Sequence, residues 1–87
     1  MSATDTIRTV EQLKSLLRAA RRRKGLSQTQ LGALLGLSQE RVSVLEQHPG
    51  RMSVDQLLTL LMALDQDMLV RPRGEFSVRD SADQGGW

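Results

Sequence analysis

Residues 28–46 constrain the fold most, because a single glycine separates two short runs of helical periodicity. The first run has an apolar stripe at helical spacing, made of Leu31, Leu34 and Leu35. Gly36 follows at once, where a helix commonly ends in a left-handed residue, a conformation that glycine adopts without strain. Ser38 can cap a second helix, whose apolar stripe is Val42 and Leu45. We therefore predict two short helices joined by a tight turn.

Gly32 lies inside the first of these helices, where glycine costs about 1 kcal/mol relative to alanine. That cost is understandable if a second backbone crosses close to the helix at this position. Leu37 supplies an apolar side chain to the turn. Together these features describe a helix-turn-helix, a motif that places its second helix in the major groove of DNA.

Capping boxes mark the starts of three helices. In each, a Ser or Thr is followed three residues later by Gln: Thr9 and Gln12, Ser27 and Gln30, Ser53 and Gln56. The first helix is expected to stop at Gly25, and the third near Gln47, because His48-Pro49-Gly50 cannot continue it. Two helices have wide apolar faces, made of Leu13, Leu16, Leu17 and Ala20 and of Leu57, Leu58, Leu60, Leu61 and Leu64. The predicted fold class is all-α, with one helix-turn-helix domain over residues 1–66.

The pattern changes at residues 68–73, which are partly β-branched and interrupted by a proline. We predict one edge strand there. A single strand has no partner within this chain, and the same strand of a second protomer would supply one. Residues 67–73 are thus expected to form the dimerisation strand of a homodimer, with contacts from Met68, Leu69, Val70 and Arg71.

Charge divides the chain unevenly. Residues 1–73 carry 11 Lys/Arg and 7 Asp/Glu, a net charge of +4, whereas residues 74–87 carry 1 Arg and 3 acids, a net charge of −2. A basic folded part favours encounter with a polyanion such as DNA. Residues 74–87, rich in Gly, Ser and Asp, are predicted to be a flexible C-terminal tail. The only aromatic residues, Phe76 and Trp87, lie in it, which argues against an aromatic platform for single-stranded nucleic acid.

Composition narrows the class further. The chain has 87 residues and no cysteine, so we expect one small domain without disulfides or thiolate metal sites. No apolar run approaches the roughly 18 residues that span a bilayer, and the polar N-terminus lacks a secretory signal, so a cytoplasmic location without membrane contact is expected. His48, the only histidine, has no ligand partner at metal spacing, and no nucleophile–base pair is present. We predict neither an enzyme nor a cofactor nor a metal site.

The start of the second motif helix carries the candidate base-reading side chains. If Val42 and Leu45 face the core, the polar side chains around them face outward. Glutamine can bond adenine bidentately, glutamate accepts from cytosine, and valine can contact the thymine methyl group. The predicted base contacts are Ser38, Gln39, Glu40, Ser43 and Val44. The alternative is an ordinary solvated helix face.

Candidate phosphate contacts come from two sources. Gln28 opens the first motif helix, where backbone N–H groups and a polar side chain can hold a phosphate. Basic side chains can add electrostatic contacts to the DNA backbone, and the candidates are Arg22, Arg23, Lys24, Arg41 and Arg51. The respective alternatives are a simple neighbour of the helix cap and a solvated charge run.

The stretch L-S-Q-T-Q-L-G-A-L-L-G-L-S-Q-E-R-V-S-V-L-E resembles the motif helices of the lambda-repressor/Cro family, also called the Xre type. The lead-in T-V-E-Q-L-K-S-L-L-R-A-A-R, the strand-like residues 68–73 and Trp87 together resemble HipB-type antitoxins. In that family a dimer represses its own operon and binds the HipA kinase toxin, on which a tryptophan of the tail docks.

The resemblance implies roles for matching residues. It makes Ser38, Gln39 and Ser43 operator contacts, Gln28 a phosphate contact and Trp87 the docking residue for a HipA-like serine/threonine kinase toxin. Glu40 departs from the small residue expected there, which implies a different operator sequence. The resemblance covers residues 7–73 well and residues 74–87 only at Trp87.

Three interpretations stay open at this point. The first is a DNA-binding autorepressor that is also an antitoxin, with operator duplex, a second copy of the chain and a kinase toxin as partners. The second is a stand-alone Xre-type regulator without a toxin. The third is a protein-interaction module that uses the same fold without reading DNA. A kinase-like gene beside this one would favour the first.

Overall fold

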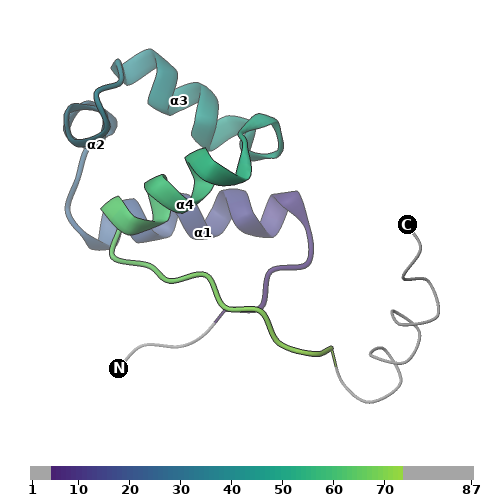
Figure 1. The fold of residues 1–87 in the computed structure, drawn as a ribbon. Coiled ribbons are helices and arrows are strands. Elements are labelled where there is room, and N and C mark those ends of the chain that lie inside the picture. The colour runs from purple at the N-terminus through teal and green to yellow at the C-terminus, as the bar shows by residue number, and fades with distance from the viewer. Residues whose placement is uncertain (1–4, 74–87) are drawn as a thin grey trace.

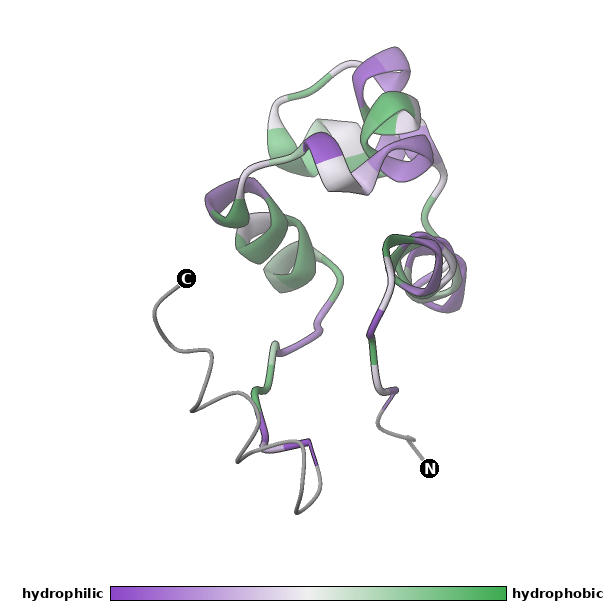
Figure 2. Cartoon of the chain, turned by 90° about the vertical axis from the view of Figure 1, so that its right-hand side faces the viewer, coloured by the Kyte–Doolittle hydropathy of each residue, from purple (hydrophilic) through white to green (hydrophobic). Residues whose placement is uncertain are grey.

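The computed structural model describes residues 5–73, and its regular structure there is helical (Figure 1). The elements are α1 (Val10–Arg23), α2 (Gln28–Leu35), α3 (Gln39–Gln47), the 3-10 turn η1 (Pro49–Arg51) and α4 (Val54–Ala63). Figures 1 and 2 show α2 and α3 on one side of the molecule and α1 and α4 on the other. Among the described residues, none of the helices has the length and apolar character needed to cross a membrane.

All three predicted capping boxes are confirmed. The hydroxyls of Thr9, Ser27 and Ser53 accept the backbone N–H three residues on, and the glutamine at that position reaches back to the backbone N–H of the cap. Ser38 caps α3 by accepting the N–H of Arg41 at 3.1 Å. Each α-helix therefore begins at a side-chain cap that accepts one of the backbone N–H groups left without a partner within the helix.

The helix ends share one design. Gly25 and Gly36 both have φ of +72°, and the chain reverses through them. At the second of these turns, the N–H of Leu37 donates to the carbonyl of Gly32 at 2.8 Å. After α4, Asp65 takes the same left-handed conformation, with φ of +58°. The sequence did not indicate this turn, because helix ends of this kind are usually recognised by a glycine.

Gly32 confirms the predicted close approach. A Cβ built at this residue would collide with the carbonyl oxygen of Leu37 and would lie 3.3 Å from Cγ2 of Val42. The turn backbone therefore needs the space that a side chain would fill, and this explains a glycine in the middle of a helix. Close packing of α2 on the turn and α3 follows from that single missing atom.

Leucines and small aliphatic residues from every α-helix build the core. Its buried members are Leu17, Ala20, Leu31, Val42, Leu45, Leu60, Leu61 and Leu64. Leu13, Leu16, Leu35, Leu37 and Leu57 are partly buried against it. In Figure 2, α4 is green over much of its length, whereas α1, seen nearly end-on, is largely purple on its outer side.

Two residues of the predicted stripes do not lie in this core. Leu34 is 63% exposed and Leu58 is 46% exposed. In α2 the buried face is rotated toward Gly32, which packs on the turn, so Leu34 points away from its centre. In α4 the buried residues centre on Leu60, Leu61 and Leu64, and Leu58 belongs to a flank. Apolar spacing in the sequence therefore did not distinguish the leucines that a single chain buries from those that it leaves exposed.

The segment after α4 has no strand within the described residues. It runs past the residues that precede α1 (Figure 1), where Nη2 of Arg71 donates to Oγ1 of Thr6 at 2.9 Å. Met68, Leu69 and Val70 are exposed there. Because strand pairing would need a second copy, the dimerisation strand stays a prediction, as does the division at residues 66 and 67. Residues 74–87, including Trp87, lie outside the described residues.

Candidate nucleic-acid interface

The turn at Gly36 presents the start of α3 to solvent. Val42 and Leu45 are buried, as predicted, so the opposite side of the helix faces outward. Ser38, Gln39 and Glu40 are exposed at its first turn. These three consecutive polar side chains therefore lie at one end of a short helix whose opposite side packs in the core.

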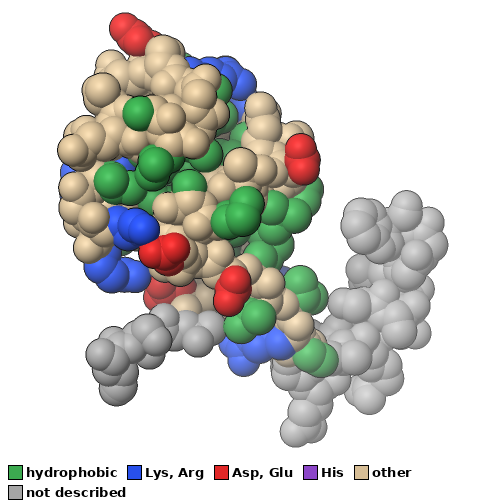
Figure 3. All heavy atoms as spheres, turned by 60° about the vertical axis from the view of Figure 1, so that its left-hand side comes forward, with side chains coloured by type: hydrophobic (Ala, Val, Ile, Leu, Met, Phe, Trp, Pro, Cys, Tyr) green, Lys and Arg blue, Asp and Glu red, His purple; other side chains and the backbone are tan. Residues whose placement is uncertain are grey.

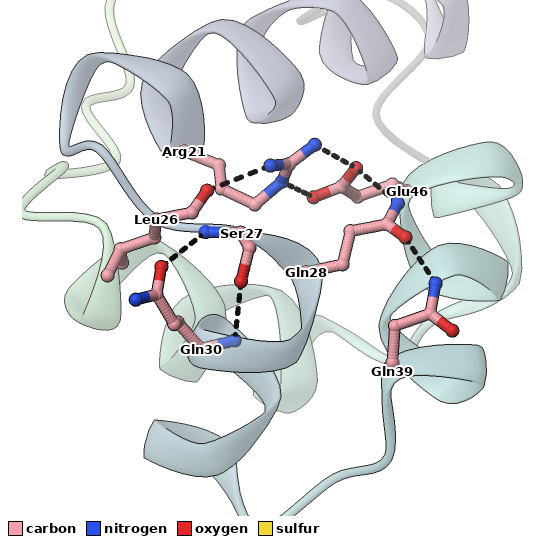
Figure 4. A network of polar contacts seen from close by, with 7 residues as sticks. All are labelled: Arg21, Leu26, Ser27, Gln28, Gln30, Gln39 and Glu46. Atoms are coloured by element: carbon pink, nitrogen blue, oxygen red, sulfur yellow. Dashed lines mark hydrogen bonds and ion pairs between the residues drawn. The ribbon is translucent and has the colours of Figure 1, made fainter.

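A glutamine pair joins the two motif helices at this end. Nε2 of Gln39, the first residue of α3, donates to Oε1 of Gln28, the first residue of α2, at 2.6 Å (Figure 4). Gln28 is half-buried and Gln39 is exposed. The structure thus brings together two residues for which the sequence predicted different roles, a phosphate contact for Gln28 and a base contact for Gln39.

The glutamine pair is anchored on a buried ion pair. Nε2 of Gln28 donates to Oε1 of Glu46 at 3.1 Å, and Glu46 is 2% exposed. The guanidinium of Arg21 donates to both oxygens of Glu46, through Nε to Oε2 and through Nη2 to Oε1 at 3.2 Å. Nη1 of Arg21 also donates to the carbonyl of Leu26 at 2.9 Å, which ties the network to the loop between α1 and α2 (Figure 4).

The pair of Arg21 and Glu46 was not found from the sequence. Arg21 stands in a basic run, and such a run usually marks a solvated surface. A usable signal was present nonetheless, because Arg21 follows Leu17 by one helical turn and Glu46 follows Val42 by one turn. Both charged residues therefore fall on the apolar faces of their helices.

The remaining predicted base contacts differ in accessibility. Glu40 is exposed, Val44 is 43% exposed and Ser43 is half-buried. Ser38 is exposed, but its oxygen already accepts the N–H of Arg41, which leaves its own O–H free to donate. All of these residues lie on or beside the first two turns of α3.

The predicted phosphate contacts divide into two groups. All five basic candidates are exposed, and the first group consists of Arg22, Arg23, Arg41 and Arg51. Lys24 is engaged, because its Nζ lies 2.7 Å from Oδ2 of Asp65 just beyond α4. That ion pair joins the ends of α1 and α4 and competes with any contact of Lys24 to DNA.

The described part of the chain holds no candidate metal site. Residues 5–73 hold no group of three or more His, Cys, Asp or Glu side chains that could bind a metal ion. His48 is exposed and closes the end of α3, where its N–H donates to the carbonyl of Val44 at 2.9 Å. Its position is that of a helix-end residue.

Comparison with known proteins identifies the same motif. A family model described as a helix-turn-helix domain matches residues 1–71. No curated protein and no solved structure matches the chain. The matched residues include every helix that the structure describes and every predicted DNA contact.

Proposed function

Because the chain belongs to the helix-turn-helix domain family, we propose that it is a transcription regulator that binds a specific operator duplex through α3. The observation that supports this most is the exposed amide of Gln39, which is held at the start of α3 by Gln28. A fixed amide at the first turn of such a helix can meet a base edge in the major groove. Ser38, Glu40, Ser43 and Val44 are the proposed neighbours in base reading.

Phosphate contacts on either side would orient α3. Gln28 and Thr29 open α2, and backbone N–H groups in a first turn have no acceptor within their own helix. Those groups, with the exposed Arg22, Arg23, Arg41 and Arg51, are the proposed contacts to the DNA backbone. Lys24 would have to exchange its ion pair with Asp65 for a phosphate in order to join them.

Replacing Gln39 with alanine should weaken operator binding by roughly 1–3 kcal/mol and relax the preference at one base position, because a direct base contact is lost. Replacing Arg22 with alanine is the matched contrast. It should weaken binding to all sequences about equally and reduce the dependence of affinity on salt. Titration of each variant against the gene's own promoter and against random duplex, at two salt concentrations, measures both effects.

The promoter titration also tests the function itself. A regulator of this class should prefer its promoter to random duplex at both salt concentrations. Equal affinity of the unmodified protein for the two duplexes would reject sequence-specific binding and favour the protein-interaction module.

We further propose that the regulator acts as a homodimer that uses the face of α4 and the segment after it. Val54, Leu58 and Met62 are exposed at helical spacing, and Met62 is 70% exposed. Leu58, Met62 and Met68 help to line an open groove of about 500 Å³. Figure 3 shows hydrophobic side chains gathered on this face and continuing into the C-terminal segment, with acidic side chains beside them.

A second copy of the chain is the occupant that fits this face. The groove is also lined by Asp65 and Asp67, while the apolar residues that follow are succeeded by Arg71 and Arg73. In a two-fold arrangement, the Leu69 and Val70 of one copy could enter the groove of the other. Its arginines could then meet the carboxylate of Asp67 and, in competition with Lys24, that of Asp65. The same arrangement would pair the two segments as the predicted strands.

The antitoxin role is the finer proposal, and it rests on the resemblance to HipB-type proteins. On this proposal the regulator also neutralises a HipA-like serine/threonine kinase, which Trp87 contacts. Trp87 is the only tryptophan of the chain, and tryptophan is a favoured anchor of protein interfaces. A stand-alone regulator remains the alternative, and it predicts no kinase gene beside this one.

Deletion of Trp87 should weaken binding to the neighbouring kinase by more than about 2 kcal/mol, because an interface anchor would be lost. Operator affinity should stay unchanged, since none of the proposed DNA contacts is removed. Calorimetric titration of the kinase with the full-length and shortened chains measures this effect. Indistinguishable affinities would rule out the anchoring role.

A further inference from the structure

The hydrogen-bond chain from Glu46 to Gln39 has a chemical direction. A carboxylate can only accept hydrogen bonds, and Glu46 is held in place by both the Nε and the Nη2 of Arg21. Gln28 must therefore turn its Nε2 toward Glu46, to which it donates at 3.1 Å. The amide of Gln28 is thus oriented from inside the protein.

That orientation is passed on to the surface. With its nitrogen on Glu46, Gln28 presents Oε1 to α3, and this oxygen accepts from Nε2 of Gln39 at 2.6 Å (Figure 4). Gln39 uses one of its two N–H donors in this bond. One N–H and the carbonyl oxygen remain on the exposed side chain.

One donor beside one acceptor matches one purine and not the other. Adenine offers N7 as an acceptor and the N6 amino group as a donor in the major groove, whereas guanine offers two acceptors, N7 and O6. If the chain ran in reverse, Gln39 would give its oxygen to Gln28 and turn both N–H donors outward. That edge would match guanine.

We infer that Glu46, buried and without access to DNA, is a positioning residue that selects adenine over guanine at the base pair read by Gln39. Arg21 fixes the carboxylate of Glu46, and this carboxylate accepts the side-chain N–H of Gln28. Gln28 therefore presents its oxygen to Gln39, which leaves one N–H and the oxygen of Gln39 to face the base. The inference rests on the proposed operator binding and names the base class that this site takes.

A double replacement, Arg21→Met with Glu46→Leu, separates positioning from folding. Replacing a buried ion pair by apolar residues of similar volume is often neutral for stability or stabilising. The change also leaves the net charge of the protein unaltered, since one cation and one anion are removed together. Gln28 would then lose its fixed acceptor and become free to turn.

The binding probe is the duplex that the unmodified protein selects from a randomised pool, with the Gln39 position identified by the relaxed preference of Gln39→Ala. At that base pair, the unmodified protein should favour adenine over guanine by at least about fivefold. The double variant should bring this ratio close to one, while its affinity for random duplex stays the same. Gln28→Met, which leaves the ion pair intact, should also lower the ratio, and it should weaken binding to all duplexes if Gln28 contacts phosphate.

An NMR measurement on the DNA-free protein provides the independent readout. In the unmodified protein, the side-chain NH₂ signals of Gln28 and Gln39 should be shifted from the positions of a free glutamine and should exchange slowly with water. In the double variant, they should move toward the free positions and exchange faster. A folded double variant that keeps the full preference for adenine would overturn the positioning role. If that variant does not fold, Gln28→Met decides in its place, and an unchanged ratio there would overturn the role equally.

The two proposals fail in different ways. Absence of any preference between selected and random duplex in the unmodified protein would reject operator binding, and the positioning role with it. A clear preference for the selected duplex, combined with an unchanged purine ratio in the variants, would reject only the positioning role.

Discussion

Replacing Arg21 with methionine should destabilise the domain by about 3–5 kcal/mol, because it leaves the carboxylate of Glu46 buried without its charged partner. Methionine keeps the approximate volume and the helix propensity of the arginine, so neither a cavity nor a helix break explains the loss. The carbonyl of Leu26 also loses the donor Nη1 of Arg21. Urea unfolding followed by circular dichroism should show a midpoint shifted far toward lower concentration.

The chain offers a matched control in its other ion pair. Lys24 and Asp65 have side chains that are 35% and 75% exposed. Lys24→Ala should therefore cost less than about 1 kcal/mol, as exposed ion pairs usually do. The double variant Arg21→Met with Glu46→Leu should recover most of the stability lost in the single one. A single variant as stable as the unmodified protein would show that Glu46 tolerates burial without its partner.

Local signals account for most of the fold that the sequence predicted. Helix starts at Thr9, Ser27, Ser38 and Ser53 depend on residues within one turn, so short patterns are sufficient to locate them. The requirement for glycine at residue 32 could be anticipated because the motif itself implies a close crossing. The helix-turn-helix identification rests on these local features and is supported by the matching family model.

Contacts between distant residues account for what was missed. Arg21 and Glu46 are 25 residues apart, and the sequence around either residue does not indicate that the two form an ion pair. The exposure of Leu34 depends on how α2 is rotated against its neighbours, which periodicity over an eight-residue helix cannot define. The network behind Gln39 follows the same rule, because its four side chains come from three helices that the chain brings together only on folding.

The exposure of Leu58 has a different origin. Periodicity placed it with the apolar residues of α4, and it is apolar, but its stripe continues through Val54 and Met62 on a face that a single chain leaves open. The apolar surface of α4 is wider than one protomer can cover. The discrepancy is therefore itself an argument for a second copy on that face.

Truncation after Asp67 should convert the protein to a monomer and weaken operator binding by about 100-fold or more, because linked occupancy of two half-sites is lost. The truncation removes Leu69 and Val70, the exposed residues that are proposed to enter the groove of the second copy, and Met68, which helps to line that groove. Half-sites one helical turn apart, about 34 Å, should be bound together only by the dimer. Sedimentation velocity and operator titration measure the two effects.

Two controls assign these effects to the segment itself. A chain that ends at Arg73 should remain a dimer, which separates residues 68–73 from those that follow. The paired replacement of Leu69 and Val70 with serine should also yield monomers, since Val70 is 93% exposed and contributes nothing to the core of its own chain. Leu34→Ser removes a similarly exposed leucine outside the groove and should leave the dimer intact. A truncated protein that still sediments as a dimer would place the interface elsewhere and would leave the open face of α4 without the partner proposed for it.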